Sequence, residues 1–202
     1  MLQILYSNPI TFVLALLSLV LSIAIHEFSH AFVAMKLGDF TAKSLGRLTL
    51  NPLAHIDGLG LALLVFFGFG WGKPVPVNYY NLKNPKRDSA LISIAGPVSN
   101  LMLAAFLALL LRIFPFGTIL SAFFYILISY NVLLAIFNLL PIHPLDGFKV
   151  VYGLLPPSLA LQWMEIERFG PVILLFILVT GSVSTVLIPI VTVIMRFLGL
   201  SY

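Results

Sequence analysis

The sequence predicts an all-α polytopic membrane protein. We expect a core of three transmembrane helices, a short membrane-associated hairpin or re-entrant segment, and one or two further C-terminal spans. Of the 202 residues, 60% are hydrophobic and only 9% are charged, and the mean hydropathy of +1.09 is far above that of soluble domains. The apolar residues also gather into runs long enough to cross a bilayer. We treat residues 1–202 as a single integral membrane domain, with its core at about 9–150 and C-terminal spans at about 170–200.

The first apolar run, from Pro9 to Met35, predicts a transmembrane helix. About 27 residues at about 1.5 Å each extend about 40 Å, which crosses a bilayer with some tilt. The run has no basic segment before it and is too long for the apolar part of a signal peptide. We therefore expect an uncleaved first span.

The next two segments predict structure at the membrane surface. Residues 39–56 are polar and rich in turn formers, and the alternation from Thr41 to Leu50 favours a short strand or hairpin. Leu59 to Trp71 is apolar but only about 13 residues long, with three internal glycines. That length favours a re-entrant or interfacial element over a complete span.

The second half of the chain contains the remaining predicted spans. Apolar runs at about 89–114 and 118–140 flank a tight turn at Pro115–Gly117. Residues 141–169 contain several prolines. The last run, 170–200, is interrupted by glycine and proline and predicts one kinked span or two short ones.

Charge asymmetry orients these spans. Seven of the eleven basic side chains lie in residues 36–88, and cytoplasmic loops are enriched in Lys and Arg. We therefore expect residues 36–88 and 141–169 in the cytoplasm, and the N-terminus and the 115–117 turn outside. The net charge of +4 is small and no basic run is interleaved with base-reading residues, so nucleic acid is not an expected partner.

One pentapeptide in the first span predicts chemistry, His26-Glu27-Phe28-Ser29-His30. Ionisable groups in hydrocarbon are costly and are usually functional. Residues four apart share a helix face, so His26 and His30 can bind one zinc ion, with Glu27 beside them as general base. Counting back from Lys36 places the two histidines roughly 9 and 15 Å from the end of the helix, nearer the cytoplasmic side.

A catalytic zinc usually has three protein ligands and one open position. Because the chain has no cysteine, the candidates for the third ligand are the following: Asp146, His143, Asp57 and His55. Pro141 and Pro144 break the helix before Asp146 and allow irregular backbone to carry this side chain inward. The alternative is that Asp146 caps the helix after Gly147. We favour the ligand role because two intramembrane histidines need a further partner.

With these residues in place, the chain resembles the site-2 protease family of intramembrane zinc metallopeptidases (peptidase M50 type), in its small branch without an inserted PDZ domain. The similarity runs from about residue 20 to 150. It is carried by His26–His30, Asn51–Asp57, Trp71–Val77, Ala95–Asn100 and Leu145–Gly147. The chain departs from the family pattern at Gly58, where proline is common, and at His143, where proline or an apolar residue is usual.

The resemblance implies a site. His26, His30 and Asp146 would bind one Zn2+ per chain, and Glu27 would be the general base. Asn138 would be a second catalytic residue that hydrogen-bonds the substrate or the developing oxyanion.

Three further polar residues are candidates for supporting or substrate contacts: His55, Asn100 and His143. The alternative for His55 is an ordinary polar loop residue. The alternative for Asn100 is a helix–helix contact within the membrane.

The expected function is an intramembrane zinc metalloendopeptidase that hydrolyses peptide bonds in or near transmembrane segments of membrane proteins. Its expected partners are a transmembrane substrate and the lipid bilayer, in the cell membrane of a prokaryote. A helical substrate must unwind, and we expect the edge of a strand within residues 41–50 to hold it extended.

Three alternatives belong to other classes. A membrane zinc transporter would need further ligands along a second span, and residues 89–114 and 118–140 contain no histidine or acid. A catalytically inactive scaffold would not need Glu27. A metallopeptidase of another lineage would take its third ligand from Glu165 or Glu167, which lie in a polar stretch.

Overall fold

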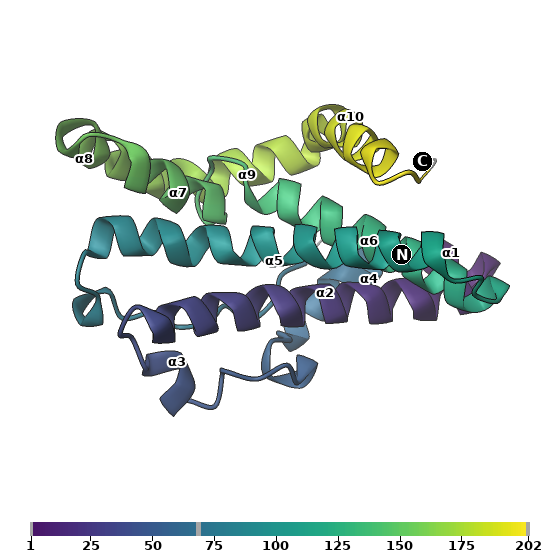
Figure 1. The fold of residues 1–202 in the computed structure, drawn as a ribbon. Coiled ribbons are helices and arrows are strands. Elements are labelled where there is room, and N and C mark those ends of the chain that lie inside the picture. The colour runs from purple at the N-terminus through teal and green to yellow at the C-terminus, as the bar shows by residue number, and fades with distance from the viewer. Residues whose placement is uncertain (1, 68–69, 201–202) are drawn as a thin grey trace.

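The computed structural model describes residues 2–67 and 70–200. Within these residues the chain forms helices and one isolated antiparallel bridge, with no strand (Figure 1). The α-helices are α1 (Leu2–Ser7), α2 (Pro9–Lys36), α3 (Thr41–Ser44), α4 (Gly58–Phe67), α5 (Pro85–Ile113), α6 (Thr118–Asn138), α7 (Asp146–Leu154), α8 (Pro157–Ile166), α9 (Gly170–Val179) and α10 (Ser182–Phe197). The short 3-10 turns are η1 (Pro52–Ala54), η2 (Tyr79–Asn81) and η3 (Glu167–Phe169).

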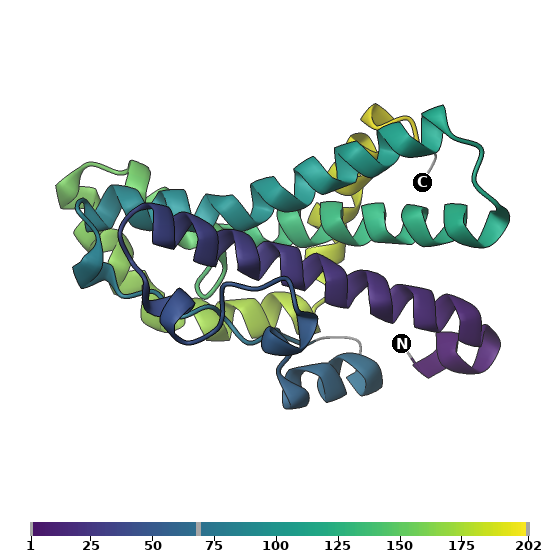
Figure 2. The same cartoon turned by 60° about the horizontal axis from the view of Figure 1, so that its bottom comes forward.

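Three of these helices, α2, α5 and α6, are long and apolar enough to cross a membrane, which confirms the predicted core. They lie side by side in both ribbon views (Figures 1 and 2). One buried cluster joins α5 and α6 to α10: Ala104, Leu107, Ala108, Leu127, Ile128, Val132, Val191 and Met195. Small residues in this cluster allow close approach of the helices, which is how spans associate in lipid.

Local sequence sets the ends of the long helices. The Asn8 side chain accepts a hydrogen bond from the Thr11 amide at 3.1 Å, and Pro9 occupies the first turn, so α2 begins there. Gly38 follows α2 with φ at +109°, which only glycine adopts readily. The α5 helix begins four residues earlier than expected, because Pro85 starts it and Asp88 accepts a hydrogen bond from the Asn84 amide at 2.9 Å.

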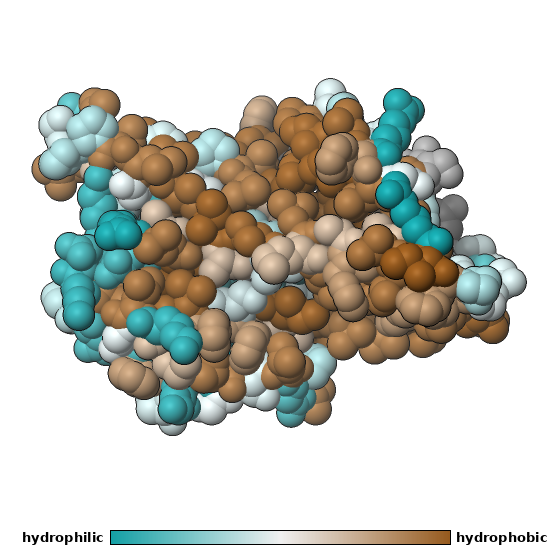
Figure 3. Space-filling model, in the orientation of Figure 1, coloured by the Kyte–Doolittle hydropathy of each residue, from teal (hydrophilic) through white to brown (hydrophobic). Residues whose placement is uncertain are grey.

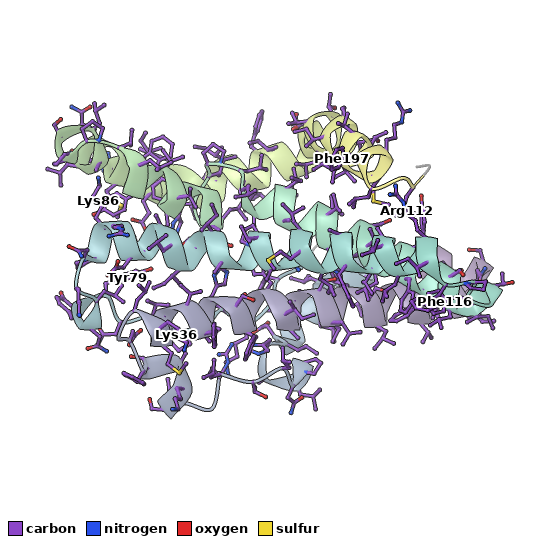
Figure 4. All side chains as sticks on the ribbon, viewed as in Figure 1. Lys36, Tyr79, Lys86, Arg112, Phe116 and Phe197 are labelled. Atoms are coloured by element: carbon purple, nitrogen blue, oxygen red, sulfur yellow. The ribbon has the colours of Figure 1, made fainter. Side chains whose placement is uncertain are left out.

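Polar side chains gather at the two ends of the bundle and apolar ones lie between them (Figure 3). Lys36, Tyr79 and Lys86 lie at one end and Arg112 at the other (Figure 4). The Lys86 ammonium donates to the Leu155 carbonyl. Residues 141–169 and 36–88 therefore contact one another at one end, and their cytoplasmic location stays a prediction.

The segment around α4 leaves and returns at one place. Ile56 pairs with Gly72 in the antiparallel bridge, and the Lys73 amide donates to the His55 carbonyl at 2.8 Å. Because its two ends are bonded together, this segment does not run across the bundle. This fits the predicted hairpin or re-entrant element.

The strand predicted at 41–50 is wrong. Residues Thr41–Ser44 form helix α3, and Gly46 turns the chain with φ at +68°. The Asp39 carboxylate accepts from the Thr41 amide at 3.1 Å and from its hydroxyl at 2.5 Å, which starts a helical turn. This local hydrogen bonding outweighs the weak alternation in the sequence.

The C-terminal run forms a bent pair of helices. The segment up to Val179 and the helix that follows it are bent by 80°, and the break contains Gly181, with φ at +71°. Gly170 packs against His143, and Gly199 packs against Arg112 at the other end of the bundle. Among the described residues there are thus three helices able to span, or four spans if the bent pair is one.

Candidate metal centre

The structure brings together three predicted ligands from distant parts of the chain. The Oδ2 atom of Asp146 lies 3.0 Å from His26 Nε2 and 3.2 Å from His30 Nε2. Both histidines are buried in α2, and their rings stand at 88° to one another. In the described part of the chain, this is the one group of three or more His, Asp or Glu residues placed to hold a metal ion.

Asp146 reaches this place through the turn between α6 and α7. A Cβ added at Gly147 would lie 2.2 Å from the Leu139 carbonyl oxygen and 2.4 Å from that of Leu140. Only glycine allows this approach, so the turn folds tightly and α7 begins at Asp146. The alternative role as a helix cap is wrong, because Leu145 occupies the cap position and no side-chain cap bond is made.

Hydrogen bonds from α5 fix both histidine rings. The Nδ1 atom of His30 lies 2.7 Å from the Ile92 carbonyl oxygen, and Nδ1 of His26 lies 2.6 Å from Asn100 Oδ1. Both partners only accept hydrogen bonds, so each Nδ1 carries the proton. With the proton on Nδ1, Nε2 is the atom left to bind a metal, and both Nε2 atoms lie beside the carboxylate of Asp146.

The donor set fits zinc. Two neutral imidazoles and one carboxylate are typical of a catalytic zinc site. Three atoms bonded to one tetrahedral zinc at about 2.0–2.2 Å lie roughly 3.3 Å apart, and the contacts to Asp146 Oδ2 are 3.0 and 3.2 Å. Three ligands leave one position for water.

Gly96 of α5 closes one side of the site. A Cβ there would lie 2.6 Å from His26 Cε1 and 2.6 Å from His30 Nε2. The α5 backbone therefore packs directly on both rings. Any larger side chain would displace them.

The predicted general base, Glu27, is half-buried and bonded to a loop. Its Oε2 atom accepts a hydrogen bond from the Val75 amide at 2.8 Å. Val75 lies between Pro74 and Pro76, which have no amide hydrogen to donate. The loop therefore presents this one donor to the carboxylate.

The structure places the predicted supporting residues differently from one another. Asn100 bonds both His26 of α2 and Asn131 of α6, so the supporting contact and the helix–helix contact are both present. His55 is fully buried but bonds Thr49 and Arg47 within the loop. His143 faces Glu167, with Nδ1 3.3 Å from Oε1.

Asn138, at the end of α6, donates to the Leu134 carbonyl at 2.9 Å. Within the described residues, no hydrogen bond joins it to the three ligands. Its catalytic role stays a prediction.

Sequence reasoning missed Ile92, Gly96 and Asn131. Gly96 lies within the Ala95–Asn100 motif, and Asn131 is a polar residue in an apolar span. These two features were the sequence signals from which Gly96 and Asn131 could have been found. The Ile92 contribution is a backbone carbonyl, for which the side chain gives no signal.

An apolar bundle that carries two histidines and an aspartate around one point, with a glutamate adjoining, defines a membrane zinc metallopeptidase. Comparison with known proteins identifies the family. The sequence model of "Peptidase family M50" matches residues 114–178. The chain is 44% identical to "Putative zinc metalloprotease YwhC" of Bacillus subtilis, over 86% of this chain and 83% of that protein.

Two other relatives agree. "Putative zinc metalloprotease Rip2" of Mycolicibacterium smegmatis is 32% identical, over 86% of this chain and 69% of that protein. "Zinc metalloprotease MJ0392" of Methanocaldococcus jannaschii is 26% identical, over 74% of this chain and 36% of that protein. No solved structure matches the chain. The chain belongs to peptidase family M50 and is an integral membrane zinc metalloendopeptidase.

Proposed function

We propose that this protein cleaves peptide bonds in or near transmembrane segments of other membrane proteins, using His26, His30 and Asp146 as zinc ligands and Glu27 as general base. The observation that carries this proposal is the convergence of both histidine Nε2 atoms on Asp146 from within an apolar, membrane-length helix. A site at this position acts on a segment that enters from the bilayer.

The residues divide the chemistry between them. One zinc ion would act as a Lewis acid, polarising the peptide carbonyl and making water more acidic. Glu27, held by the Val75 amide, takes a proton from water and delivers it to the leaving amine. Asn138 is proposed to donate a hydrogen bond to the developing oxyanion, for which its amide would have to turn from the Leu134 carbonyl. Loss of one such donor costs roughly 3–4 kcal/mol in other enzymes.

The substrate must unwind before it can react, because a helix uses its own backbone hydrogen bonds. The strand edge expected at 41–50 is absent, so that binding route does not apply. The backbone beside Glu27 belongs instead to residues 73–77.

We propose the cell membrane of a prokaryote as the location, with the site nearer the cytoplasm.

The alternatives receive less support from the structure. A transporter would pass zinc between successive ligand groups, and the described residues hold one such group. A scaffold would have no use for the bonded carboxylate of Glu27. Glu165 and Glu167 lie outside the metal group.

The test is cleavage of a transmembrane reporter by the purified protein in liposomes. Glu27→Gln is expected to lower the rate by about 100- to 10,000-fold, the range for a general base. Glu165→Gln replaces an exposed carboxylate and is expected to cleave like the wild type. Unimpaired cleavage by Glu27→Gln would refute the mechanism. Zinc flux across the same liposomes would instead support a transporter.

A further inference from the structure

We propose that Asn131 is a positioning residue of the metal centre, although it touches none of the three ligands. It fixes the side-chain amide of Asn100, and Asn100 fixes the ring of His26. This inference rests on the ligand set proposed above. It adds a second residue of α6, besides Asn138, to those proposed to act at the metal centre.

Asn131 and Asn100 are both completely buried, in the middle of α6 and α5. A buried amide without partners is costly, most of all in a span surrounded by lipid. The two amides bond each other, with Asn100 Nδ2 2.7 Å from Asn131 Oδ1. Their burial is thus compensated by a contact that joins two helices.

The direction of each hydrogen bond follows from backbone carbonyls, which can only accept. Asn100 Nδ2 also lies 3.0 Å from the Ser22 carbonyl oxygen, which identifies it as the donor end of that amide. The opposite end, Oδ1, therefore faces His26. In the same way, Asn131 Nδ2 lies 2.7 Å from the Leu127 carbonyl oxygen, so Asn131 Oδ1 faces Asn100.

Ser22 completes this chain of bonds. Its hydroxyl donates to the Ser18 carbonyl at 2.7 Å and accepts from Asn131 Nδ2 at 2.8 Å. Protons are therefore donated in one direction, from His26 through Asn100 and Asn131 to Ser22 and Ser18. The order requires the proton of His26 to be on Nδ1, which leaves Nε2 free for zinc.

Asn131 holds this order in place. Without its Oδ1, the Asn100 amide keeps one anchor, the Ser22 carbonyl, and can turn its NH2 group toward His26. A donor at that position favours the proton on Nε2, which blocks the metal-binding atom. His30 is an internal reference, because its Nδ1 bonds the Ile92 carbonyl and has no link to Asn131.

The first measurement is zinc affinity of the purified full chain, by competition with a chelator. Asn131→Leu keeps the side-chain size and removes the hydrogen bonds. Its affinity is expected to fall about 10- to 100-fold, as for other groups that orient metal-bound histidines. Asn131→Asp keeps an oxygen toward Asn100 and, as the neutral acid that burial in a span favours, has a hydroxyl donor in place of Nδ2, so its affinity is expected to stay near the wild type.

Ser18→Ala is the matched control. Ser18 is fully buried on α2, and its hydroxyl has no hydrogen-bond partner in the described part of the chain. Ser22 bonds its backbone carbonyl, which alanine retains. Zinc affinity of Ser18→Ala is expected to be unchanged.

A double-mutant cycle separates positioning from general destabilisation. If Asn131 acts through Asn100, then Asn131→Leu lowers affinity no further when Asn100→Leu is already present. NMR of the zinc-bound protein gives a second readout. The Nδ1 proton of His26 is expected to exchange faster with water in Asn131→Leu, and that of His30 is expected to remain unchanged.

The outcomes are distinct. Unchanged affinity in Asn131→Leu, additive losses in the cycle, or equal exchange at both histidines would overturn the proposal. If Asn131→Leu does not fold, Ser22→Ala and Asn131→Asp carry the test, with a smaller loss expected for Ser22→Ala and none for Asn131→Asp. Full zinc affinity in His26→Ala would overturn the ligand set itself.

Discussion

The proposed metal ligands and the proposed general base are held by different kinds of structure. Both histidines belong to one helix and bond a second, α5, while Asp146 begins a third. Glu27 shares their helix, but its carboxylate bonds a loop at Val75. Helices hold side chains more rigidly than loops do. The proposed ligands are thus fixed by contacts between helices, and the proposed base is fixed by a hydrogen bond from a loop.

The loop that supports Glu27 has its own buried anchor. The Arg47 guanidinium donates to the Lys73 carbonyl at 2.6 Å and lies 3.4 Å from His55 Nδ1. Lys73 is two residues before Val75. His55, for which a supporting role at the site and an ordinary loop role were both open, therefore contributes to the loop.

The largest effect is expected from removing one of the proposed ligands that the helices hold. Asp146→Ala removes the only anionic ligand, and loss of zinc forfeits several kcal/mol of transition-state stabilisation, so cleavage should fall roughly 100-fold or more. Metal content and reporter cleavage measure this. Asp57→Asn, which lies just before α4, serves as the control. A normal zinc content in Asp146→Ala would contradict the third-ligand assignment.

A milder break on the same side is Gly96→Ala. The added Cβ would lie 2.6 Å from atoms of both imidazoles, so the rings or α5 would have to move. Overpacking of this kind typically costs about 1–3 kcal/mol of stability. We expect weaker zinc binding together with a lower unfolding temperature. Gly117→Ala, where a Cβ meets nothing within 4 Å, provides the comparison. Equal zinc affinity in the two variants would show that the packing of α5 against the histidine rings does not affect metal binding.

Arg47→Met tests the loop that supports Glu27. It removes the hydrogen bond from the guanidinium to the Lys73 carbonyl and keeps an apolar side chain. Because the ligands are untouched, zinc affinity should be retained while cleavage falls, by about tenfold if one hydrogen bond of 1–2 kcal/mol positions Glu27. Lys43→Met changes a cation on the adjoining turn and should cleave normally. If Arg47→Met lost both zinc and cleavage, the loop would support the metal ligands as well as Glu27, and the proposed division between helices and loop would be wrong.

The smallest effect is expected at Asp39, which joins the loop to the end of α2. Burial opposes its ionisation, but hydrogen bonds from Thr41, Asn81 and Asn78 outweigh it and hold the pKa of Asp39 below its usual range. A lowered pKa gives stability that is complete above the unfolded value of about 4 and is lost as pH falls through the folded value. Unfolding followed against pH should therefore show a shallower acid decline in Asp39→Asn. An identical decline would show that another carboxylate governs it.

Patterns local in sequence were the ones that predicted structure well. The spacing of His26 and His30 fixes a shared face on any helix, and apolar runs reveal spans because lipid demands them. Asp146 was recognisable through its motif and the requirement for a third ligand. The failed strand at 41–50 rested on weak alternation, which a single carboxylate, Asp39, outweighed.

The remaining parts of the site depend on tertiary packing. Gly96 matters because two rings from another helix lie against it, and Asn131 because two further helices bring their polar groups to it. Neither partner is near in sequence. His55 looked equivalent to Asn100 as a polar residue in a motif, and only the fold separates their roles.

The start of α7 at Asp146 has a consequence for the folding of the whole bundle. A metal ion bound by His26, His30 and Asp146 is a cross-link that closes a loop of more than a hundred residues. Such a link restricts the unfolded chain and ties the first span to the helix that follows the third. By mass action, free zinc at about 100 times its dissociation constant would add about 2.7 kcal/mol to the folded state. On the proposed ligand set the ion would also be a structural tie, and its removal by a chelator is expected to loosen the bundle between α2 and α7.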